Sequence, residues 1–522
     1  MAGSFEMKTG PLVSVLIPTF NRRRTLPAAL SSVLRQRYAN IEVFVIRDGG
    51  DGVQDIVGFF NDPRIVLIDR EENRGKAFSL NEALVLAKGK YVAYLDDDDL
   101  YYSNHVGVLV GCLERRTDCK VAYSDLYRTY CRVKPDGGRE VLGKVLEVSR
   151  DFNRFVMLYF NHTLHVSLMH HRDLLDKTGP YNENLDVLID WDFTRRASFF
   201  SDFHHVCEIT GEYFSPVGEC DRISVIRRRN QDDYLRNVMT IRTSRPSKPW
   251  PMIGDVSIIL STEQLDQRAR QTMLSIWRHT FYPYKVYLPL TAAEIATLNI
   301  EMPNVVPVPV SVGELKERRI DEALAGCEGE YTAVVPCGFP VGELWLEESL
   351  YPLVSGFADH CAFELEGATE QLWAFVVRTD ELRLARKEFS HLSVRDSLVA
   401  CGVSIRRVSP EEIPFQLDQS LAQARLAGEQ SDWRRAAGIL EYASEHYGNG
   451  LWLNALTAEA YFKAAQYDRS AELCRQINRR RPIVDTLLLE AKVNRKTDNF
   501  ELAINLLQRA MQILEGTGSV WT

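Results

Sequence analysis

The first hundred residues alternate short apolar runs with stretches whose apolar positions recur every three or four residues. A helical stripe covers residues 25–37, and a second one covers residues 77–87. Four apolar runs have the length of buried β-strands: residues 13–18, 42–46, 65–68 and 91–95. Strands separated by helices of this length predict a parallel α/β sheet, whose ligands bind where the strands end.

A second α/β region follows a proline-rich stretch. Residues 244–251 (SRPSKPWP) predict a linker. After it, Val256–Leu260 resembles Val13–Ile17 of the first region, 243 residues earlier, and Gly329 lies 240 residues after Gly89 in a similar context. Chance similarity between two strand–helix–strand units is the alternative, but the length of the match favours a duplicated α/β domain.

The last hundred residues have helical periodicity throughout. Trp433, Tyr467 and Phe500 recur at spacings of 34 and 33 residues, and a 34-residue helix–turn–helix period is typical of tetratricopeptide repeats. A plain helical bundle is the alternative. Such repeats leave a concave surface, which predicts a protein partner or self-association. The sequence therefore predicts three domains: residues 1–245, 252–415 and 416–522.

Composition narrows the class of protein. The 522 residues carry 62 Lys and Arg against 71 Asp and Glu, a net charge of −9, so we expect no nucleic-acid partner. The ten cysteines form no Cys-x-x-Cys pair, which favours reduced thiols in a cytosol. We expect no signal peptide, and no run of roughly 20 apolar residues is present. We expect a cytoplasmic protein, at most peripheral at the inner face of a membrane, with no transmembrane segment.

An acidic run marks the candidate site. Asp96–Asp99 directly follow the apolar run 91–95, and four adjacent carboxylates repel one another unless a cation relieves them. A hard divalent ion accepts carboxylate and phosphate oxygens together. A solvated acidic turn is the alternative, but the position after a buried strand favours metal binding. Thr19 and Asp48 also fall where predicted strands end.

Five segments, in order along the chain, resemble those of the family 2 glycosyltransferases with a GT-A fold. The segments are Val13–Asn21, Arg47–Gly50, Asn73–Gly75 with Asn81, Leu95–Asp99, and Asp190–Asp192 with Arg196. The resemblance covers residues 12–240. It implies a GT-A nucleotide-diphospho-sugar transferase domain, built on a Rossmann-like mixed sheet, in the first α/β region.

The resemblance implies an inverting, metal-dependent glycosyltransferase of the hexosyltransferase type. It would move a sugar from a UDP- or dTDP-sugar to a hydroxyl of a glycan, a lipid-linked acceptor or a protein, in bacterial surface-glycan or protein glycosylation. Asp190 would be the general base, Asp98 would hold Mn²⁺ or Mg²⁺, and Asp48 would accept a hydrogen bond from the uracil or thymine ring. The other nucleotide-sugar-binding residues would be Pro18, Thr19, Asn21, Arg74, Asp96, Asp97 and Asp192.

The sequence departs from the family pattern at several positions. Arg47 replaces the first Asp of a family pair, and this adjacent cation predicts an ionised Asp48. Ile189 replaces the Glu before the base. No His follows in residues 213–224 to complete a metal shell. For the other basic side chains, the simpler expectation is a structural role or exposure to solvent. These side chains are His162, His165, His170, His171, His204, His205 and the run Arg227–Arg229.

The second α/β region lacks these carboxylates. Pro336–Phe339 align with Asp96–Asp99, and Val394 aligns with Asp190, so a degenerate GT-A-like domain is predicted for residues 252–415. One alternative function is a non-catalytic, nucleotide-sugar-sensing scaffold of a glycan-assembly complex. Another is nucleotidyl transfer. The carboxylates of the first domain argue against a non-catalytic scaffold. Nucleotidyl transfer would leave the Asp-Trp-Asp segment without a role.

Overall fold

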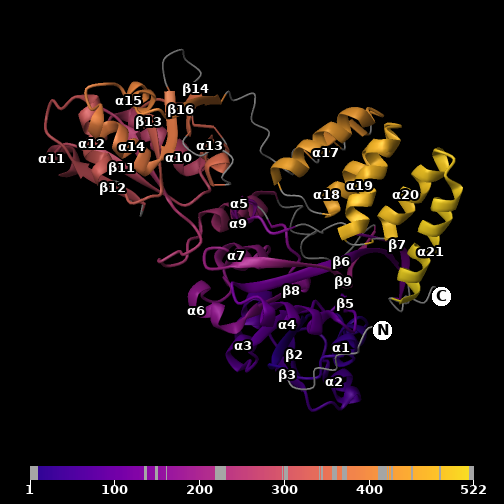
Figure 1. Cartoon of the computed structure of the whole chain (residues 1–522). Coiled ribbons are helices and arrows are strands. Elements are labelled where there is room, and N and C mark those ends of the chain that lie inside the picture. Colours follow the sequence, from indigo (N-terminus) through magenta and orange to yellow (C-terminus); the bar gives the residue numbers. More distant parts are fainter. Residues whose placement is uncertain are drawn as a thin grey trace. The chain divides into compact units, whose positions relative to one another are not determined.

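The chain forms two compact units, Met1–Lys248 with Leu417–Thr522, and Pro249–Gln416 (Figure 1). The computed structural model describes residues 10–134, 138–146, 151–159, 161–217, 231–296, 298, 304–339, 341–342, 345–354, 361–366, 373–408, 420, 423–424, 427–428, 430–447, 451–480, 482 and 484–516. None of the helices in these ranges combines the length and hydropathy that a membrane-spanning segment needs.

The first unit contains a mixed sheet in the order β3-β2-β1-β4-β8-β6-β9-β5, with β7 paired to β6. Its strands are β1 (Val13–Thr19), β2 (Ile41–Asp48), β3 (Ile65–Arg70), β4 (Tyr91–Tyr94), β5 (Leu100–Tyr101), β6 (Cys119–Val133), β7 (Arg139–Val145), β8 (Leu168–His171) and β9 (Asp202–Pro216). The first four are parallel to one another. They correspond to the four apolar runs, which confirms that part of the prediction. Strand β8 runs antiparallel to both β4 and β6, so the sheet is mixed and not purely parallel.

Helices cover both faces of this sheet, which explains why β1 is buried almost throughout. Alternate residues of β1 enter two different cores. Val15 and Ile17 pack with α1 and α4, whereas Leu16 packs with α3 and α7. The helices are α1 (Leu26–Leu34), α2 (Gln54–Phe60), α3 (Lys76–Leu86), α4 (His105–Arg115), α5 (Arg154–Tyr159), α6 (Leu175–Thr178), α7 (Ile189–Ala197) and α9 (Gln231–Thr243), with 3₁₀ turns at His165–Ser167 and Arg172–Leu174. Because α3 and α7 share one core, their N-terminal residues can reach the same site.

The second unit contains a sheet in the order β12-β11-β10-β13-β15-β14-β16. Its strands are β10 (Val256–Ser261), β11 (Tyr284–Leu290), β12 (Val305–Pro309), β13 (Tyr331–Pro336), β14 (Cys361–Glu366), β15 (Trp373–Arg378) and β16 (Ser404–Val408). Its helices are α10 (Gln267–His279), α11 (Ala292–Ala296), α12 (Lys316–Ala325), α13 (Trp345–Val354), α14 (Thr379–Glu388) and α15 (Val394–Ala400).

The seven strands of the second sheet have the same order and directions as seven strands of the first. Strands β10 to β16 correspond in turn to β1, β2, β3, β4, β6, β8 and β9, and each parallel or antiparallel pairing is the same. Strands β5 and β7 of the first sheet have no counterpart among these seven. Val13 faces Ile41 and Tyr91, and Val256 faces residues at the equivalent positions, Tyr284 and Tyr331.

The same polar contact recurs in both sheets. The Gly89 amide donates to the Ser14 hydroxyl at 2.9 Å, and the Gly329 amide donates to the Ser257 hydroxyl at 2.9 Å. A Cβ atom at Gly89 would lie 2.6 Å from the Ser14 amide nitrogen, and one at Gly329 would lie 2.7 Å from that of Ser257. Glycine is therefore required at both positions by close backbone approach.

Consecutive antiparallel helices follow at the C-terminal end of the described chain: α17 (Trp433–Tyr447), α18 (Leu451–Lys463), α19 (Tyr467–Arg480), α20 (Val484–Lys496) and α21 (Phe500–Gly516), each packed on the next (Figure 1). The odd-numbered helices begin at the three aromatic residues whose spacing suggested a repeat. Ser431, Ala465 and Asp498 each lie two residues before one of these helices and adopt φ of 62°, 58° and 58°. The turn that leads into each of these helices thus has one repeated backbone form.

These helices contact the first sheet. The Leu146 amide, just beyond β7, donates to Asp485 Oδ2 of α20 at 3.3 Å, and burial raises the pKa of Asp485. Leu146 and Ile477 form a small apolar cluster with Cys207, Ile209 and Ala455. The helical region and the first sheet therefore belong to one compact unit.

Candidate active site

The candidate site lies where β1, β2 and β4 end. Thr19 is the last residue of β1 and faces Arg47, the residue before Asp48, at the end of β2. Asp96 follows β4 by two residues. The side chains of Thr19 and Asp48 are buried, whereas Asp96 is about a quarter exposed, with 28% of its side-chain surface accessible.

Three of the four adjacent aspartates form a group that can hold a metal ion. Asp96, Asp98 and Asp99 each offer a carboxylate oxygen, and these atoms lie within 4.8 Å of one another. Asp97 is not in this group. Burial raises the pKa of Asp97 to about 7, and the neighbouring charge of Asp98 adds to the effect. Sequence reasoning assigned the metal to Asp98 alone and missed Asp99, although Asp99 belongs to the same acidic run.

The turn that carries this group is held from two sides. Arg139 Nη1, at the start of β7, donates to the carbonyl oxygen of Asp98 at 2.6 Å. The amide of Phe214 on β9 donates to Asp99 Oδ1 at 2.8 Å. The Arg139 guanidinium also lies 4.6 Å from the centre of the Phe214 ring. These contacts hold the backbone of the turn at Asp98 and the carboxylate of Asp99 in place.

Lys76, the first residue of α3, lies among the carboxylates. It forms an ion pair with Asp96. Burial opposes the charge on Lys76, but the carboxylates of Asp96, Asp190 and Asp98 outweigh it and raise the pKa of the amine. Sequence reasoning missed Lys76. The available signal was its position directly after Asn73–Gly75, at the predicted start of a helix.

Asp190 reaches the same place from the N-terminus of α7. Leu188, directly before the helix, has φ of 62°, a conformation that costs a non-glycine residue about 1–3 kcal/mol. Asn161 Nδ2 donates to Asp190 Oδ2 at 2.9 Å. Burial raises the pKa of Asp190, while Lys76 and the Trp191 amide partly offset the effect. A carboxylate with increased proton affinity is suited to accept a proton.

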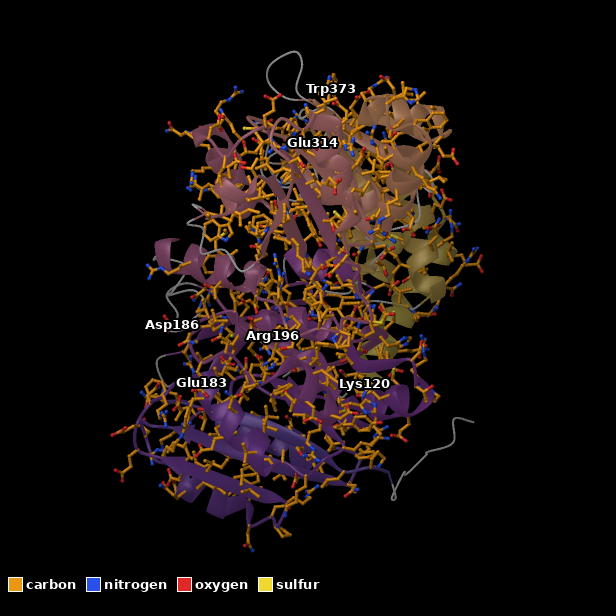
Figure 2. All side chains as sticks on the ribbon, turned by 90° about the vertical axis from the view of Figure 1, so that its left-hand side faces the viewer. Lys120, Glu183, Asp186, Arg196, Glu314 and Trp373 are labelled. Atoms are coloured by element: carbon orange, nitrogen blue, oxygen red, sulfur yellow. The ribbon has the colours of Figure 1, made fainter. Side chains whose placement is uncertain are left out.

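The side chain of Asp192 points into the protein. It is 1% exposed and pairs with Arg196, one helical turn later, through Oδ2 at 2.6 Å. Arg196 also donates to the backbone oxygens of Thr178 and Gly179. Arg196 is buried, whereas Glu183 and Asp186 lie on the exposed loop before α7; Figure 2 labels all three residues. The contacts of Asp192 are those of a residue that fixes the start of α7.

Asp48 is held at the end of β2 by two donors. The amide of Arg74 donates to Asp48 Oδ1 at 2.8 Å, and Arg70 Nη2 lies 3.1 Å from the same oxygen. Arg47 was expected to be the neighbouring cation, but it pairs with Asp69 at 2.5 Å. Adjacent residues of a strand point to opposite faces of the sheet. The residue of β3 that lies opposite Asp48 of β2 is Arg70.

The remaining predicted residues border the same strand ends. Pro18 is half-buried near the end of β1. Asn21 has φ of 55°, and its Oδ1 accepts the amide of Asp51 at 3.0 Å. A Cβ on Gly50 would collide with that oxygen. The guanidinium of Arg74 lies 3.4 Å from the centre of the Phe78 ring, on the exposed side of α3.

Two histidines near the site are buried among aromatic rings. His165 Nε2 lies 2.9 Å from the Tyr181 hydroxyl, and His170 Nε2 lies 2.6 Å from the Tyr94 hydroxyl. Burial lowers the pKa of His165 to about 3 and that of His170 to about 4, so both imidazoles are neutral near pH 7. The run Arg227–Arg229 lies outside the described residues.

Residues 14–163 match the family model of glycosyl transferase family 2. The match covers β1 to β4, the acidic turn and Asn161, and ends before Asp190. The chain is 38% identical over 103 residues to a UDP-Glc:alpha-D-GlcNAc-diphosphoundecaprenol beta-1,3-glucosyltransferase, WfgD of Escherichia coli. This alignment covers 20% of this chain and 41% of that protein. It is 28% identical over 192 residues to a PGL/p-HBAD biosynthesis glycosyltransferase of Mycobacterium bovis, with 36% of this chain and 70% of that protein covered.

The chain spans less than half the length of two of the curated relatives that it matches. The solved structure of Staphylococcus aureus TarS 1-349 in complex with UDP-GlcNAc aligns with a TM-score of 0.36 and 19% identity, over 44% of this chain and 66% of that one. The family match independently supports a family 2 glycosyltransferase domain in the N-terminal part of this chain.

Proposed function

We propose that the chain is an inverting, metal-dependent glycosyltransferase that uses a UDP- or dTDP-sugar. The observation that carries this proposal is the meeting of Lys76, Asp96, Asp98 and Asp190 at the ends of β1, β2 and β4. A carboxylate that can accept a proton thus lies within electrostatic range of a carboxylate group that can hold a divalent cation. Both features assist the displacement of a diphosphate by a hydroxyl.

The carboxylates suit Mn²⁺ or Mg²⁺. Both ions prefer oxygen ligands, and three carboxylate oxygens within 4.8 Å of one another match that preference. Asp96, Asp98 and Asp99 are the residues that would hold the ion. When bound, it stabilises the negative charge of the departing diphosphate.

The protein side chains divide the remaining work. Asp48 would accept a hydrogen bond from the imide N–H of uracil or thymine, while Arg74, Thr19, Pro18 and Asn21 border the nucleotide. Asp96 and Asp97 would lie on the ribose side, and Asp192 would support the sugar pocket by fixing the start of α7. Lys76 would hold positive charge near the diphosphate.

Asp190 would take the proton of the acceptor hydroxyl as its oxygen attacks the anomeric carbon from the face opposite the diphosphate. The bond to the diphosphate breaks on the other side, so one displacement inverts the anomeric centre. Asn161 would keep Asp190 Oδ2 oriented toward the acceptor. The raised pKa of Asp190 makes its carboxylate a better proton acceptor.

The acceptor we propose is a hydroxyl of a glycan, a lipid-linked glycan or a protein in bacterial surface-glycan or protein glycosylation. The name of WfgD specifies a lipid-diphosphate-linked sugar as its acceptor, which supports the lipid-linked class. Such an acceptor would place this protein in the cytoplasm, at most peripheral to the inner face of a membrane.

The other regions would have supporting roles. The strand order that seven strands of the first sheet share with the second sheet supports a duplicated GT-A-like domain in the second unit. Within the described part of that unit, no three metal-capable side chains lie as close together as Asp96, Asp98 and Asp99, so we propose that this copy is degenerate. The helices from Trp433 onward would form a tetratricopeptide-like repeat that binds a protein partner or a second copy.

Calorimetry with UDP, dTDP and GDP tests the donor site, with and without Mn²⁺, on the wild type and on Asp98→Ala. Metal-dependent binding of UDP or dTDP that is lost in Asp98→Ala is the expected result. Absence of nucleotide binding at millimolar concentration, in a protein that is folded by circular dichroism, would overturn the proposal. Nucleotide binding without turnover of any sugar donor, including hydrolysis, would favour the nucleotide-sugar-sensing scaffold.

A further inference from the structure

A second cluster of metal-capable side chains lies on the first sheet, away from the acidic turn. Its centre is His205 on β9. Nε2 of His205 is 2.7 Å from Asp125 Oδ1 on β6, and Nδ1 is 3.0 Å from Asp151 Oδ1. The Sγ atom of Cys207 is 3.7 Å from the same Nδ1. The ligand atoms of Asp151, His205 and Cys207 all lie within 4.8 Å of one another.

An irregularity in β9 helps to build this cluster. Ser124 on β6 faces Val206, but the next residue, Asp125, faces Ile209, so the register shifts past Cys207 and Glu208. Such bulges redirect side chains and are over-represented beside functional sites. Cys207 lies at this irregularity, two residues after His205 on the same strand, and its Sγ atom lies beside the His205 ring.

We propose that Asp151, His205 and Cys207 bind one zinc ion, with the fourth position open to water. In a tetrahedral site with ordinary zinc–ligand bond lengths, a sulfur and a nitrogen ligand lie about 3.6 Å apart, and a nitrogen and an oxygen ligand about 3.4 Å. The sulfur–nitrogen separation of 3.7 Å is close to the first value, and the nitrogen–oxygen separation of 3.0 Å is shorter than the second by about 0.4 Å. Sulfur, imidazole nitrogen and carboxylate oxygen are all ligands that zinc accepts.

Asp125 fits the role of the outer partner of the histidine. Its side chain is 1% exposed, and it accepts from His205 on the nitrogen that faces away from Asp151 and Cys207. Metal-binding histidines usually donate their second N–H to a carboxylate, which fixes the ring and its tautomer. The Tyr123 ring stacks on His205, with centroids 5.0 Å apart, and further restrains the imidazole.

The cluster is separate from the proposed donor site. Phe214, which holds Asp99, lies seven residues beyond Cys207 on β9, a path of roughly 20 Å at the usual rise per residue. The ligand types also differ, because a thiolate and an imidazole favour zinc whereas three carboxylates favour Mg²⁺ or Mn²⁺. Loss of one site would therefore leave the other in place, and the proposed zinc site does not depend on the proposed transferase activity.

The position of Cys207 suggests what the ion does. Cys207 also packs in the apolar cluster that joins the first sheet to the helices, beside Ile477 of α19 and Ala455 of α18. An ion that links Cys207 to the segment at Asp151 would stabilise the surface of the first sheet against which α18 and α19 pack. We infer a structural role, in which zinc raises the thermal stability of the first unit.

Metal analysis of the full chain tests the site. The protein is stripped with a chelator, loaded with zinc in reducing buffer, separated by gel filtration and assayed for metal. We expect one zinc per wild-type chain and a higher melting temperature with zinc. Cys207→Ser and Asp151→Asn should lose this zinc, and Asp125→Asn, which changes only the outer partner, should weaken binding about 10- to 100-fold.

Two controls and a spectrum complete the experiment. Cys401→Ser removes another half-buried thiol and should keep the zinc, as should Asp98→Ala, which changes the proposed donor site. Cobalt substitution should give a thiolate-to-cobalt absorption band in the wild type that Cys207→Ser lacks. Zinc-free wild type after loading, or unchanged zinc affinity in Cys207→Ser, would overturn the proposal and leave His205 as an imidazolium bridging two carboxylates.

Discussion

The two sheets differ at the ends of their strands far more than in their strands. Seven strands of the first sheet have the same order and directions as the seven of the second, and both sheets place a glycine amide on a serine hydroxyl at 2.9 Å. After β4 the first sheet continues into Asp96–Asp99, whereas β13 of the second ends at Pro336 and continues into Cys337 and Gly338. Backbone packing constrains the strands, but the residues beyond them are free to gain or lose chemistry.

Among the variants that test this comparison, substitution of the proposed base should have the largest effect on activity. Asp190→Asn should lower kcat about 10²- to 10⁴-fold, because the amide cannot accept the proton of the acceptor hydroxyl. Donor binding, measured by calorimetry, should stay close to that of the wild type. Asp396→Asn, the same substitution at the start of α15 in the second unit, is the control and should leave turnover unchanged. Equal losses in the two variants would contradict the assignment of chemistry to the first unit alone.

Removal of the amide that donates a hydrogen bond to the proposed base should have the next largest effect. Asn161→Ala breaks the hydrogen bond to Asp190 Oδ2, and a hydrogen bond to a charged group contributes about 1.5–3 kcal/mol. We therefore expect kcat to fall about 10- to 100-fold, with little change in the KM for the donor. Asn40→Ala, which removes an exposed hydrogen bond to Gly10, should retain wild-type turnover. A change in KM alone would show that Asn161 does not act through the base.

Matched glycine substitutions test whether the shared glycine–serine contact stabilises both sheets. Gly89→Ala and Gly329→Ala each place a methyl group against backbone atoms within 2.7 Å, and such overpacking costs about 1–3 kcal/mol. We expect both to lower the free energy of unfolding, measured by chemical denaturation, by similar amounts. Gly143→Ala and Gly342→Ala, where no atom lies within 4 Å of the added Cβ, should be near neutral. A loss confined to Gly89→Ala would show that the shared contact matters in one sheet only.

How far the sequence could predict this structure depends on the range of the interactions involved. Strands β1 to β4 and the acidic turn follow from local patterns of apolar and charged residues. Asn161 could not be placed beside Asp190, because 29 residues separate them and only the folding of α7 joins them. The same holds for Asp125, His205 and Cys207, which meet across two strands. The direction of Arg47 was predictable, since strand alternation turns it away from Asp48.

The smallest effect we expect is a shift in pH dependence on replacing Lys76. The positive charge of Lys76 favours the ionised form of Asp190 and so lowers the pKa of that carboxyl. Lys76→Met removes this charge, so the pKa of Asp190 should rise further above its ordinary value. Because the base acts only when ionised, the acidic limb of the kcat/KM profile should move to higher pH. Lys316→Met, at the start of the equivalent helix α12, should leave the profile in place.

The direction of this shift separates two roles for Lys76. If the amine acted only on the diphosphate, Lys76→Met would raise KM for the donor and leave the acidic limb where it is. If it acts on Asp190 as well, the limb moves and the loss of activity is largest below neutral pH. A shift toward lower pH would contradict both roles, because it would require Asp190 to be more easily ionised without its neighbouring cation.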